Sequence, residues 1–537
     1  LQCRIGKRNG PAAIRMASEM VKEKLIDEKT AIGRVAPSQL DELLHPIVDP
    51  EAEKITNLLA KGLPAGPGGA TGKAVFTAQD AVDWEARGEK VVLVREETNP
   101  EDVEGMRASI AILTSRGGMT SHAALVARGW GMCCIVGAGE MKVDSAQREF
   151  TVGKTTIREG DKITLNGTVG KVYEGELPLI EPDMISDYLS HFLSLCDGIR
   201  KLKVRTNAET PADAKRALEF GAQGIGLFRI EHMFYGEGSE EPLFHLQEMI
   251  MSNNAEERKT ALDSLFPFMK NDIKETLRAM KGLPVTIRLM DPPLHEFIPH
   301  DKKRQKQLSD SLGIDSNELA RRSDALKESN PMMGHRGVRL GITHPEITEM
   351  QARSILEAAA ELTSEGVETY PEIMVPLIGM STEYDHQEKI IRDVASKIDN
   401  LGNYMVGTMI EIPRATIIAD KIAEKAEFFS FGTNDLTQMT FGFSRDDTGG
   451  FMPSYLEQGL LPEDPFASLD EGVCELVRMG IEKGRSARPD LKVGICGEHG
   501  GDPKSIHFCH DVGMDYVSCS PFRVPIARLS AAQAVLK

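Results

Sequence analysis

Eight apolar, strand-like runs alternate with helical stretches over residues 203–520, and no other feature of the chain constrains its fold as strongly. Alternation of this kind, joined by right-handed crossovers, builds a parallel sheet. Eight such units predict an α/β fold that closes into a (β/α)8 TIM-type barrel over residues 203–537. The runs are 203–208 (KVRTNA), 224–229 (GIGLFR), 285–291 (VTIRLMD), 372–377 (EIMVPL), 404–412 (YMVGTMIEI), 428–432 (FFSFG), 492–498 (KVGICGE) and 516–520 (YVSCS).

The residues before the predicted barrel have a different pattern, in which short strand-like runs dominate and an apolar helix interrupts them. A Gly/Pro-rich stretch at 62–72 indicates the entry into this β-rich domain. We therefore expect four segments: connecting helices over 1–56, a β/α domain over 57–178, a linker helix over 179–202, and the barrel over 203–537. The expected helices are 11–26, 38–44 and 182–202, and the expected strands are 90–95, 110–113, 162–165 and 171–173.

The helix inside the β-rich domain begins at Gly117–His122 (GGMTSH), a motif that suits phosphate chemistry. Thr120 and Ser121 are good helix caps, and His122 falls in the first turn of an apolar helix that Gly129 can end. A helix start gathers unpaired N–H groups and partial positive charge, which favour a phosphate. A neutral imidazole there can accept a phosphoryl group. The alternative interpretation is a capped helix with an incidental histidine.

In a (β/α)8 barrel the functional groups lie at the C-terminal ends of the strands. Arg229 and Arg288 at such ends, with Arg336 in the run MMGHRG, each offer a planar fork to phosphate or carboxylate. Alternatively, Arg229 and Arg288 pair with Glu231 or Asp291. The reactive residues at predicted strand ends are Arg229, Arg288, Asp291, Glu411, Asn434 with Asp435, and Cys496.

Two of these carboxylates, Glu411 and Asp435, end consecutive strands within reach of one hard cation. Two carboxylates with ligand oxygens and water suit Mg²⁺, and the alternative is a buried ion pair with the arginines. Asn434 and the backbone of Gly432 and Thr433 can complete the pocket with neutral hydrogen bonds. The predicted substrate-binding set is Arg229, Arg288, Asp291, Arg336, Glu411, Gly432, Thr433, Asn434 and Asp435, with Glu411 and Asp435 as the metal ligands.

Cys496 lies in the run GICGEHGG, whose glycines leave space around the sulfur. An ordinary thiol has a pKa of about 8.5, so it can donate a proton near neutrality. The alternative is a small, inert core cysteine. Together these features predict that arginines and a cation bind a small acid bearing phosphate, carboxylate or both. The thiol would exchange a proton with a carbon of that acid, and His122 would bring the phosphoryl group from another domain.

Composition narrows the partners and the compartment. The net charge of −18 argues against nucleic acid or an anionic membrane as a partner. No apolar run is long enough to span a bilayer, so we expect no membrane partner either. The eight cysteines are sparse and show neither a disulfide framework nor zinc spacing, which indicates a reducing, intracellular compartment.

Long runs of the chain closely resemble the pyruvate phosphate dikinases, a family of phosphoenolpyruvate-utilising enzymes, over essentially its whole length. The family also has a large N-terminal nucleotide-binding domain, and Leu1–Arg4 resemble its final strand, so the expected 1–56 segment is the end of that domain with linker helices. As given, the chain should lack ATP activity. One departure is Ile230, where the family commonly has Thr. The matching runs are 117–134, 224–234 (GIGLFRIEHMF), 291–297 (DPPLHEF), 332–337 (MMGHRG), 407–415 (GTMIEIPRA), 428–447 and 494–503 (GICGEHGGDP).

The resemblance implies the family reaction, which interconverts ATP, phosphate and pyruvate with AMP, pyrophosphate and phosphoenolpyruvate. It implies that a swivelling domain carries phosphorylated His122 between two active sites, and that Thr120 corresponds to a regulatory phosphorylation site of plant relatives. It also implies a homodimer formed through the barrel, in the cytosol, a plastid or a glycosome. The implied residue roles are phosphate and carboxylate binding by Arg229, Arg288 and Arg336, Mg²⁺ binding by Glu411 and Asp435, substrate contact by Gly432, Thr433 and Asn434, and proton donation to the pyruvate enolate by Cys496.

Three alternatives compete with this interpretation. Phosphoenolpyruvate synthase uses water in place of phosphate, but its histidine motif usually has Arg and Cys where this chain has Met119 and Ser121. Enzyme I of the sugar phosphotransferase system shares the barrel and a swivelling histidine, with the domain order reversed. A non-catalytic, phospho-dependent regulator is disfavoured because Cys496, Glu411 and Asp435 are all present.

Overall fold

The computed structural model describes residues 8–537 except 100–101, 119–120, 181–186, 236–237, 300–301, 329, 446–447 and 449–450. The chain divides into two compact units. The N-terminal unit contains the residues up to Ile199 together with Phe443–Ala467. The barrel unit contains Arg200–Gly442 and Ser468–Val535.

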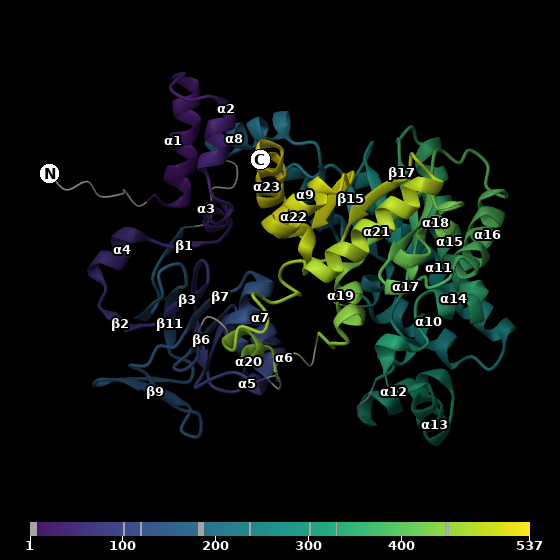
Figure 1. The fold of residues 1–537 in the computed structure, drawn as a ribbon. Helices are drawn as coiled ribbons and strands as arrows, with labels where there is room; N and C mark the ends of the chain where they lie inside the picture. The colour runs from purple at the N-terminus through teal and green to yellow at the C-terminus, as the bar shows by residue number, and fades with distance from the viewer. Residues whose placement is uncertain are drawn as a thin grey trace. The chain divides into compact units, whose positions relative to one another are not determined.

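Eight parallel strands of the barrel unit close into a barrel (Figure 1), which confirms the predicted fold class. Each strand pairs with the next along the chain, and the first pairs with the last. Every predicted run overlaps one of these strands, because strands buried on both faces are recognisable as continuous apolar runs. They are β14 (Lys203–Asn207), β15 (Ile225–Arg229), β16 (Pro284–Arg288), β17 (Tyr370–Val375), β18 (Met405–Ile410), β19 (Phe428–Phe431), β20 (Lys492–Ile495) and β21 (Tyr516–Cys519).

Helices in the connections cover the barrel, and the longest connection runs from β16 to β17. Its helix α15 packs along α11, and ion pairs such as Lys270–Glu361 and Arg278–Glu365 join the two helices. The helices of this unit are α9 (Pro211–Glu219), α10 (Glu240–Met251), α11 (Ala255–Ala279), α12 (Lys302–Leu312), α13 (Ser316–Leu326), α14 (Val338–Thr343), α15 (Pro345–Ser364), α16 (Ser381–Ala395), α17 (Pro413–Ile417), α18 (Ala419–Ala423), α19 (Thr433–Phe441), α21 (Glu471–Ala487), α22 (Pro503–Asp511) and α23 (Val524–Leu536).

The N-terminal unit is built on a mixed sheet with the strand order β2-β12-β11-β4-β5-β6-β7-β3. Its two faces follow the alternation of apolar residues along the strands. Val91 and Leu93 pack with helices α5 (Ala78–Glu85), α6 (Val103–Ala108) and α7 (His122–Trp130). Val92 and Val94 belong to the core on the opposite face, which includes Phe150 of β9 (Glu149–Val152). The strands are β2 (Leu58–Lys61), β3 (Leu63–Gly66), β4 (Gly69–Val75), β5 (Val91–Arg95), β6 (Ala111–Thr114), β7 (Cys133–Val136), β11 (Lys162–Asn166) and β12 (Lys171–Glu174).

The remaining elements of the N-terminal unit include the predicted helices near its start, and α8 confirms a helix within the predicted range 182–202. A two-stranded ladder joins β1 to β13, and β8 to β10 form a small antiparallel sheet. These elements are α1 (Gly10–Lys22), α2 (Glu28–Arg34), α3 (Pro37–Asp41), α4 (Pro50–Ile55), α5 (Ala78–Glu85), α6 (Val103–Ala108), α7 (His122–Trp130), α8 (Asp187–Ile199), α20 (Met452–Glu457), β1 (Ile47–Val48), β8 (Lys142–Asp144), β9 (Glu149–Val152), β10 (Thr155–Arg158) and β13 (Leu179–Ile180).

Two details of this unit differ from the sequence expectations. The glycine-rich stretch 62–72 supplies β3 and part of β4 rather than only an entry loop. Glycine is needed there for close packing, since a Cβ on Gly66 would lie 2.0 Å from the Met132 carbonyl oxygen. The predicted helix end at Gly129 is also wrong: α7 continues to Trp130, and Gly131 adopts the left-handed φ of +63° that ends helices.

A buried ion-pair network lies inside the barrel. Arg205 donates to Glu372 across 2.8 Å, and both side chains are at most 3% exposed. Glu372 also accepts from Thr286 at 2.7 Å and pairs with Lys492. The Arg205 guanidinium lies 4.0 Å from the centre of the Tyr516 ring. Because each charge depends on its partners, removing one leaves the others uncompensated in an apolar interior.

We expect Glu372→Gln to lower the free energy of unfolding by about 3 kcal/mol, because two buried cations would lose their counter-charge. Unfolding in urea followed by far-ultraviolet circular dichroism measures this change. The matched control is Asp393→Asn, which breaks the exposed Lys389–Asp393 pair and should cost less than about 1 kcal/mol. Equal losses in the two variants would contradict the buried network.

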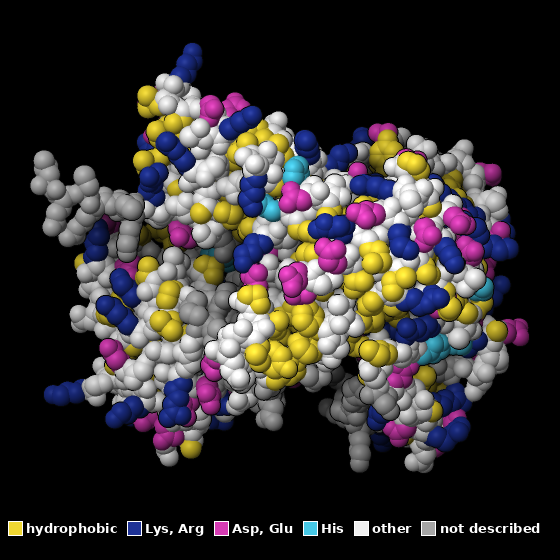
Figure 2. All heavy atoms as spheres, viewed as in Figure 1, with side chains coloured by type: hydrophobic (Ala, Val, Ile, Leu, Met, Phe, Trp, Pro, Cys, Tyr) yellow, Lys and Arg dark blue, Asp and Glu magenta, His cyan; other side chains and the backbone are white. Residues whose placement is uncertain are grey.

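Charged side chains of both signs are interspersed over the face shown in Figure 2, and no single-sign field dominates it. Among the described residues, no helix combines the length and the apolar character needed to cross a bilayer. No disulfide links the described cysteines.

Candidate active site

The C-terminal rim of the barrel brings the predicted reactive residues together. Arg229 and Arg288 are the last residues of β15 and β16. Glu411, Gly432 and Cys496 directly follow β18, β19 and β20. Parallel strands of a closed barrel end at one rim, so these side chains share one mouth.

Guanidinium and carboxylate groups form a connected cluster at this rim. Arg336 donates from Nη2 to Asp291 at 2.9 Å and to Asp435 at 2.8 Å. Arg288 lies 3.2 Å from the same Asp291 carboxylate and also pairs with Glu231. The long β16–β17 connection therefore delivers Arg336 to residues that are distant in the sequence.

The alternative prediction, an ion pair with Glu231 or Asp291, is confirmed for Arg288. Arg229 has a different partner. Arg229 donates to Glu209 at 2.9 Å, and His232 contacts the same carboxylate oxygen at 2.8 Å. Burial raises the pKa of Glu209, but His232 and Arg229 outweigh it and hold that pKa below its usual value. Arg229 is thus restrained by a half-buried partner near the mouth.

Glu411 is a deeply buried carboxylate of the cluster, and its surroundings disfavour its charged form. It is 1% exposed, and its Oε1 accepts the Leu377 N–H at 2.6 Å. Burial and the carboxylates of Asp435 and Asp291 raise the pKa of Glu411 well above its usual value, against the opposing Arg336 and Arg288.

These observations fit a divalent cation that is completed by a ligand. The acidic groups Glu231, Asp291, Glu411 and Asp435 outnumber the two arginines they surround. Within the described residues, no group of three or more His, Cys, Asp or Glu side chains is arranged as a complete metal site. Two carboxylates leave coordination positions for water and ligand oxygens, and such a donor set is chemically compatible with Mg²⁺, which retains part of its hydration.

The start of α19 forms another wall of the mouth. Gly432 precedes the helix, and Asp435 lies in its first turn. Thr433 is fully buried and its hydroxyl lies 2.7 Å from His499 Nδ1, while Asn434 accepts the Glu498 N–H at 3.4 Å. The helix start therefore presents backbone N–H groups toward an anion from a rigid position.

Cys496 is 2% exposed and packs with Leu227, Met374 and Phe428. Its carbonyl accepts from Asn207 at 3.0 Å, which fixes the backbone beside the sulfur. Burial raises the pKa of Cys496 to about 11. The thiol therefore stays protonated at neutral pH and has a proton to give.

Two buried hydroxyls near this thiol, those of Ser430 and Tyr516, were not predicted from the sequence. The Ser430 hydroxyl lowers the pKa of Cys496 against the larger effect of burial, and burial together with Cys496 raises the pKa of Tyr516. Ser430 is the polar residue in the otherwise apolar strand FFSF, a signal that could have identified it. Tyr516 carried no such signal, because an aromatic residue in a strand is ordinary.

His122 lies in the N-terminal unit, as the first residue of α7. The hydroxyl of buried Thr98 lies 2.9 Å from its Nδ1, which leaves Nε2 as the other ring nitrogen. Burial lowers the pKa of His122, although nearby Asp102 opposes this, so the ring is neutral at pH 7. Ser121 does not cap the helix through its side chain, because Oγ is buried without a hydrogen bond among the described residues. Thr120 lies outside the described residues.

Comparison with known proteins agrees with both units. Residues 185–536 match the PEP-binding domain model of PEP-utilising enzymes, and residues 87–170 match the mobile-domain model of the same enzymes. The first match contains every predicted residue of the barrel rim, and the second contains His122. Phosphoenolpyruvate-utilising proteins thus share both the barrel and the histidine-bearing domain.

Curated relatives extend the likeness over the whole chain. The chain is 53% identical to "Pyruvate, phosphate dikinase 1, chloroplastic" of Oryza sativa subsp. japonica and 54% identical to the chloroplastic dikinase of Mesembryanthemum crystallinum. It is 53% identical to "Pyruvate, phosphate dikinase 2" of Zea mays. Each alignment covers all of this chain but only 57% of the first two relatives and 61% of the third. Because the PEP-binding model covers most of the chain, the chain belongs to the family of PEP-utilising enzymes.

Proposed function

We propose that the chain transfers a phosphoryl group between phosphoenolpyruvate and His122, as the phosphoenolpyruvate half of a pyruvate, phosphate dikinase. The observation that carries this proposal is the cluster at the barrel rim, where Arg288 and Arg336 meet Asp291, Glu411 and Asp435 around the buried thiol. The likeness to the dikinases over the full chain supports the same reaction.

The arginines bind and orient the substrate. Arg288 and Arg336 are both held in place by the Asp291 carboxylate, so their guanidinium groups are preorganised to bind phosphate and carboxylate oxygens. Arg229 and the backbone of Gly432, Thr433 and Asn434 complete the contacts. Glu411 and Asp435 would hold Mg²⁺, which when bound supplies positive charge that stabilises an enolate oxygen.

The transfer moves one phosphoryl group and one proton. A neutral His122 nitrogen attacks the phosphorus of phosphoenolpyruvate, the nitrogen–phosphorus bond forms, and the bond to the enol oxygen breaks. The enolate then takes the Cys496 proton at carbon and leaves as pyruvate, and the thiolate recovers a proton from water. The contact of Thr98 with Nδ1 would hold the ring and leave Nε2 as the nitrogen that attacks the phosphorus.

The full dikinase reaction would also require ATP, phosphate, AMP and pyrophosphate at a nucleotide site. The relatives are longer than this chain, which supports a further domain in the whole protein. In that protein residues 57–178 would act as the swivelling domain between linkers 1–56 and 179–202, with 203–537 as the substrate barrel. Because the histidine would visit two separate sites, its phosphorylation by phosphoenolpyruvate can be measured without nucleotides.

A homodimer formed through the barrel stays a prediction that sedimentation can decide. The names of the rice and Mesembryanthemum relatives place those proteins in the chloroplast, which supports a plastid among the predicted compartments. Phosphoenolpyruvate synthase is the alternative function. It is disfavoured because the curated relatives are dikinases and because Met119 and Ser121 depart from its motif.

A labelling experiment tests the proposal directly. Incubation of the chain with ³²P-phosphoenolpyruvate and Mg²⁺ should give a protein label that is stable to base and labile to acid, as expected of phosphohistidine. One pyruvate should be released for each label. A protein that releases no pyruvate and takes up no label under these conditions would refute the function.

We expect Glu411→Gln and Asp435→Asn each to weaken Mg²⁺-dependent binding of oxalate, a dicarboxylate shaped like the enolate, by about a hundredfold. Both substitutions keep the side-chain shape and remove a negative oxygen ligand. Isothermal titration measures the affinity. Glu383→Gln serves as the control, because Glu383 caps α16 at the same barrel end and contacts only backbone N–H groups there. Unchanged affinity in the first two variants would exclude them as ligands.

A further inference from the structure

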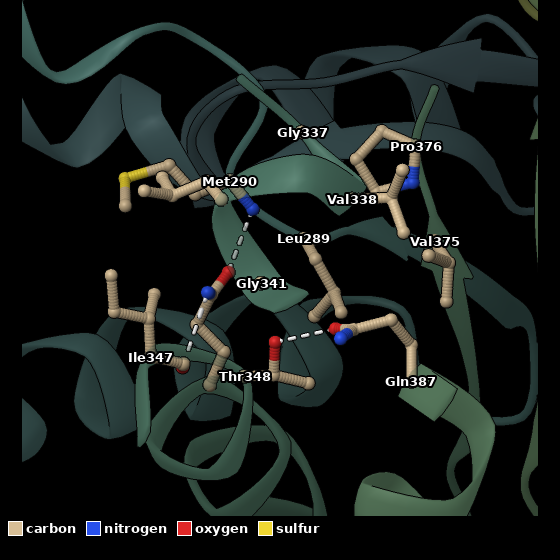
Figure 3. A pocket seen from close by; sticks show the side chains of 12 residues that line it. Leu289, Met290, Gly337, Val338, Gly341, Ile347, Thr348, Val375, Pro376 and Gln387 are labelled. Atoms are coloured by element: carbon tan, nitrogen blue, oxygen red, sulfur yellow. Dashed lines mark hydrogen bonds between the residues drawn. The ribbon is translucent and has the colours of Figure 1, made fainter. Parts of the chain in front are cut away.

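A small cavity of the barrel unit lies where two strand ends and the start of a helix meet, next to the cluster at the barrel rim (Figure 3). Leu289 and Met290 follow β16, Gly337 and Val338 begin the α14 segment, and Val375 ends β17. Three buried polar side chains also line it: Thr348 and Gln351 from α15, and Gln387 from α16.

Gln351 satisfies a backbone group that the barrel ladder leaves open. The last ladder bond of this strand end runs from the Leu289 N–H to the Met374 carbonyl at 3.0 Å. The next N–H, of buried Met290, donates to Gln351 Oε1 at 2.7 Å, along the dashed line at Met290 in Figure 3. Gln351 is 3% exposed, and its Nε2 donates to Ile347 one turn earlier in α15. The amide is therefore oriented by its own helix toward this single peptide group.

The Met290 peptide held by Gln351 is followed directly by Asp291, the carboxylate that two arginines of the rim cluster share. Asp291, the next residue, contacts both Arg288 and Arg336. Its carbonyl accepts the Gly337 N–H at 3.0 Å, which ties it to the segment that carries Arg336. Asp291 is thus restrained from one side by Gly337 and from the other by the Met290 peptide. Loss of the second restraint would let the carboxylate move with both guanidinium groups.

The other polar pair of the cavity provides a contrast. Thr348 donates to Gln387 Oε1 at 2.6 Å (Figure 3). Gln387 Nε2 also lies 3.0 Å from Nδ1 of His386. Gln387 is as buried as Gln351, yet its amide contacts side chains of helices rather than a strand-end peptide. The two glutamines therefore share burial and chemistry and differ in what they hold.

We propose that Gln351 is a positioning residue for substrate binding. Its amide fixes the Met290 peptide and through it the Asp291 carboxylate that orients Arg288 and Arg336 toward the substrate's phosphate and carboxylate groups. This inference rests on the proposed function of the rim cluster. It assigns a binding role to a side chain on a helix outside the barrel, which touches no substrate.

The test compares Gln351→Met with Gln387→Met in the 537-residue chain. Each change keeps the length of the side chain and removes a buried amide, so both should lower the melting temperature to a similar extent. The affinity for oxalate with Mg²⁺ should fall about tenfold or more in Gln351→Met, because a small displacement of binding groups is amplified. It should stay within about twofold of wild type in Gln387→Met, since that amide holds no group of the site.

Two further readouts separate positioning from general loosening. The phosphoenolpyruvate concentration that gives half the maximal rate of labelling should rise in Gln351→Met, with a smaller change in the maximal single-turnover rate. Hydrogen exchange at the Met290 amide should accelerate in Gln351→Met alone. The inference is wrong if both variants lose affinity for oxalate equally, or if Gln351→Met binds oxalate as tightly as the unmodified chain. In either case, binding of oxalate by the unmodified chain would still support the proposed function. Failure of the wild-type chain to bind oxalate would instead refute the proposed function and this inference together.

Discussion

His122→Asn should abolish labelling of the protein by ³²P-phosphoenolpyruvate, a loss of at least about ten-thousandfold. Asparagine retains a polar group at the start of α7 but has no nucleophilic ring nitrogen. Burial keeps the pKa of His122 below its usual value, so in the natural protein the neutral, nucleophilic form is available at pH 7. Autoradiography of the separated protein measures the label, and release of pyruvate measures the same transfer independently.

His191→Asn is the matched control for this experiment. His191 is an exposed histidine of α8 in the same unit, and its loss should leave labelling unchanged. Retention of label in His122→Asn would remove this histidine from the reaction. Loss of label in both variants would show that the result reflects damage to the N-terminal unit rather than loss of the acceptor.

The barrel could be predicted because its strands and its chemistry obey one rule. A strand buried on both faces must be a short apolar run, and a functional side chain must follow such a run at its C-terminal end. Arg229, Glu411 and Cys496 all stand in that position, and the structure places each at the rim. Arg336 lies in no strand, so its residue type and the resemblance of its motif, rather than a strand-end position, connected it with the mouth.

Side chains whose contacts depend on tertiary packing, rather than on their position in a motif, could not be predicted. Glu209 restrains Arg229, and Gln351 reaches Met290 from a helix 61 residues further along the chain. A glutamine in a helix has no distinctive pattern, and its partner is set by how α15 packs on the barrel. The same limit explains Ser121, whose residue type favours a cap but whose hydroxyl is buried without a partner among the described residues.

Electrostatics at the rim also depends on tertiary packing. The sequence shows carboxylates and arginines in separate motifs, and both a metal site and simple ion pairs were consistent with them. The structure combines the two: Asp435 pairs with Arg336, while Glu411 is buried close to the carboxylates of Asp435 and Asp291. A cluster with more acids than arginines binds a substrate with several negative charges only when positive charge accompanies it.

Cys496→Ala should reduce pyruvate release in the single-turnover reaction with phosphoenolpyruvate by about a thousandfold, because the enolate loses its proton donor. The thiol is suited to this role, since burial raises its pKa to about 11 and keeps it protonated at neutral pH. Binding of oxalate with Mg²⁺ should remain near wild type, because the sulfur contributes no oxygen ligand. Exchange of hydrogen between solvent and the methyl group of pyruvate, followed by nuclear magnetic resonance, should be lost in parallel.

The control for the thiol is Cys519→Ala. Cys519 ends the neighbouring strand β21, is 2% exposed like Cys496, and directs its sulfur to the Arg205 carbonyl at 4.0 Å rather than to the cluster. Its replacement removes the same buried atom from a neighbouring strand end and should leave both proton exchange and pyruvate release unchanged, because this sulfur is not directed to the cluster. If Cys496→Ala kept the wild-type rate of methyl exchange, another group would have to supply the proton. The hydroxyls of Tyr516 and Ser430 would then be the next to replace, because they lie in the same buried group as the thiol.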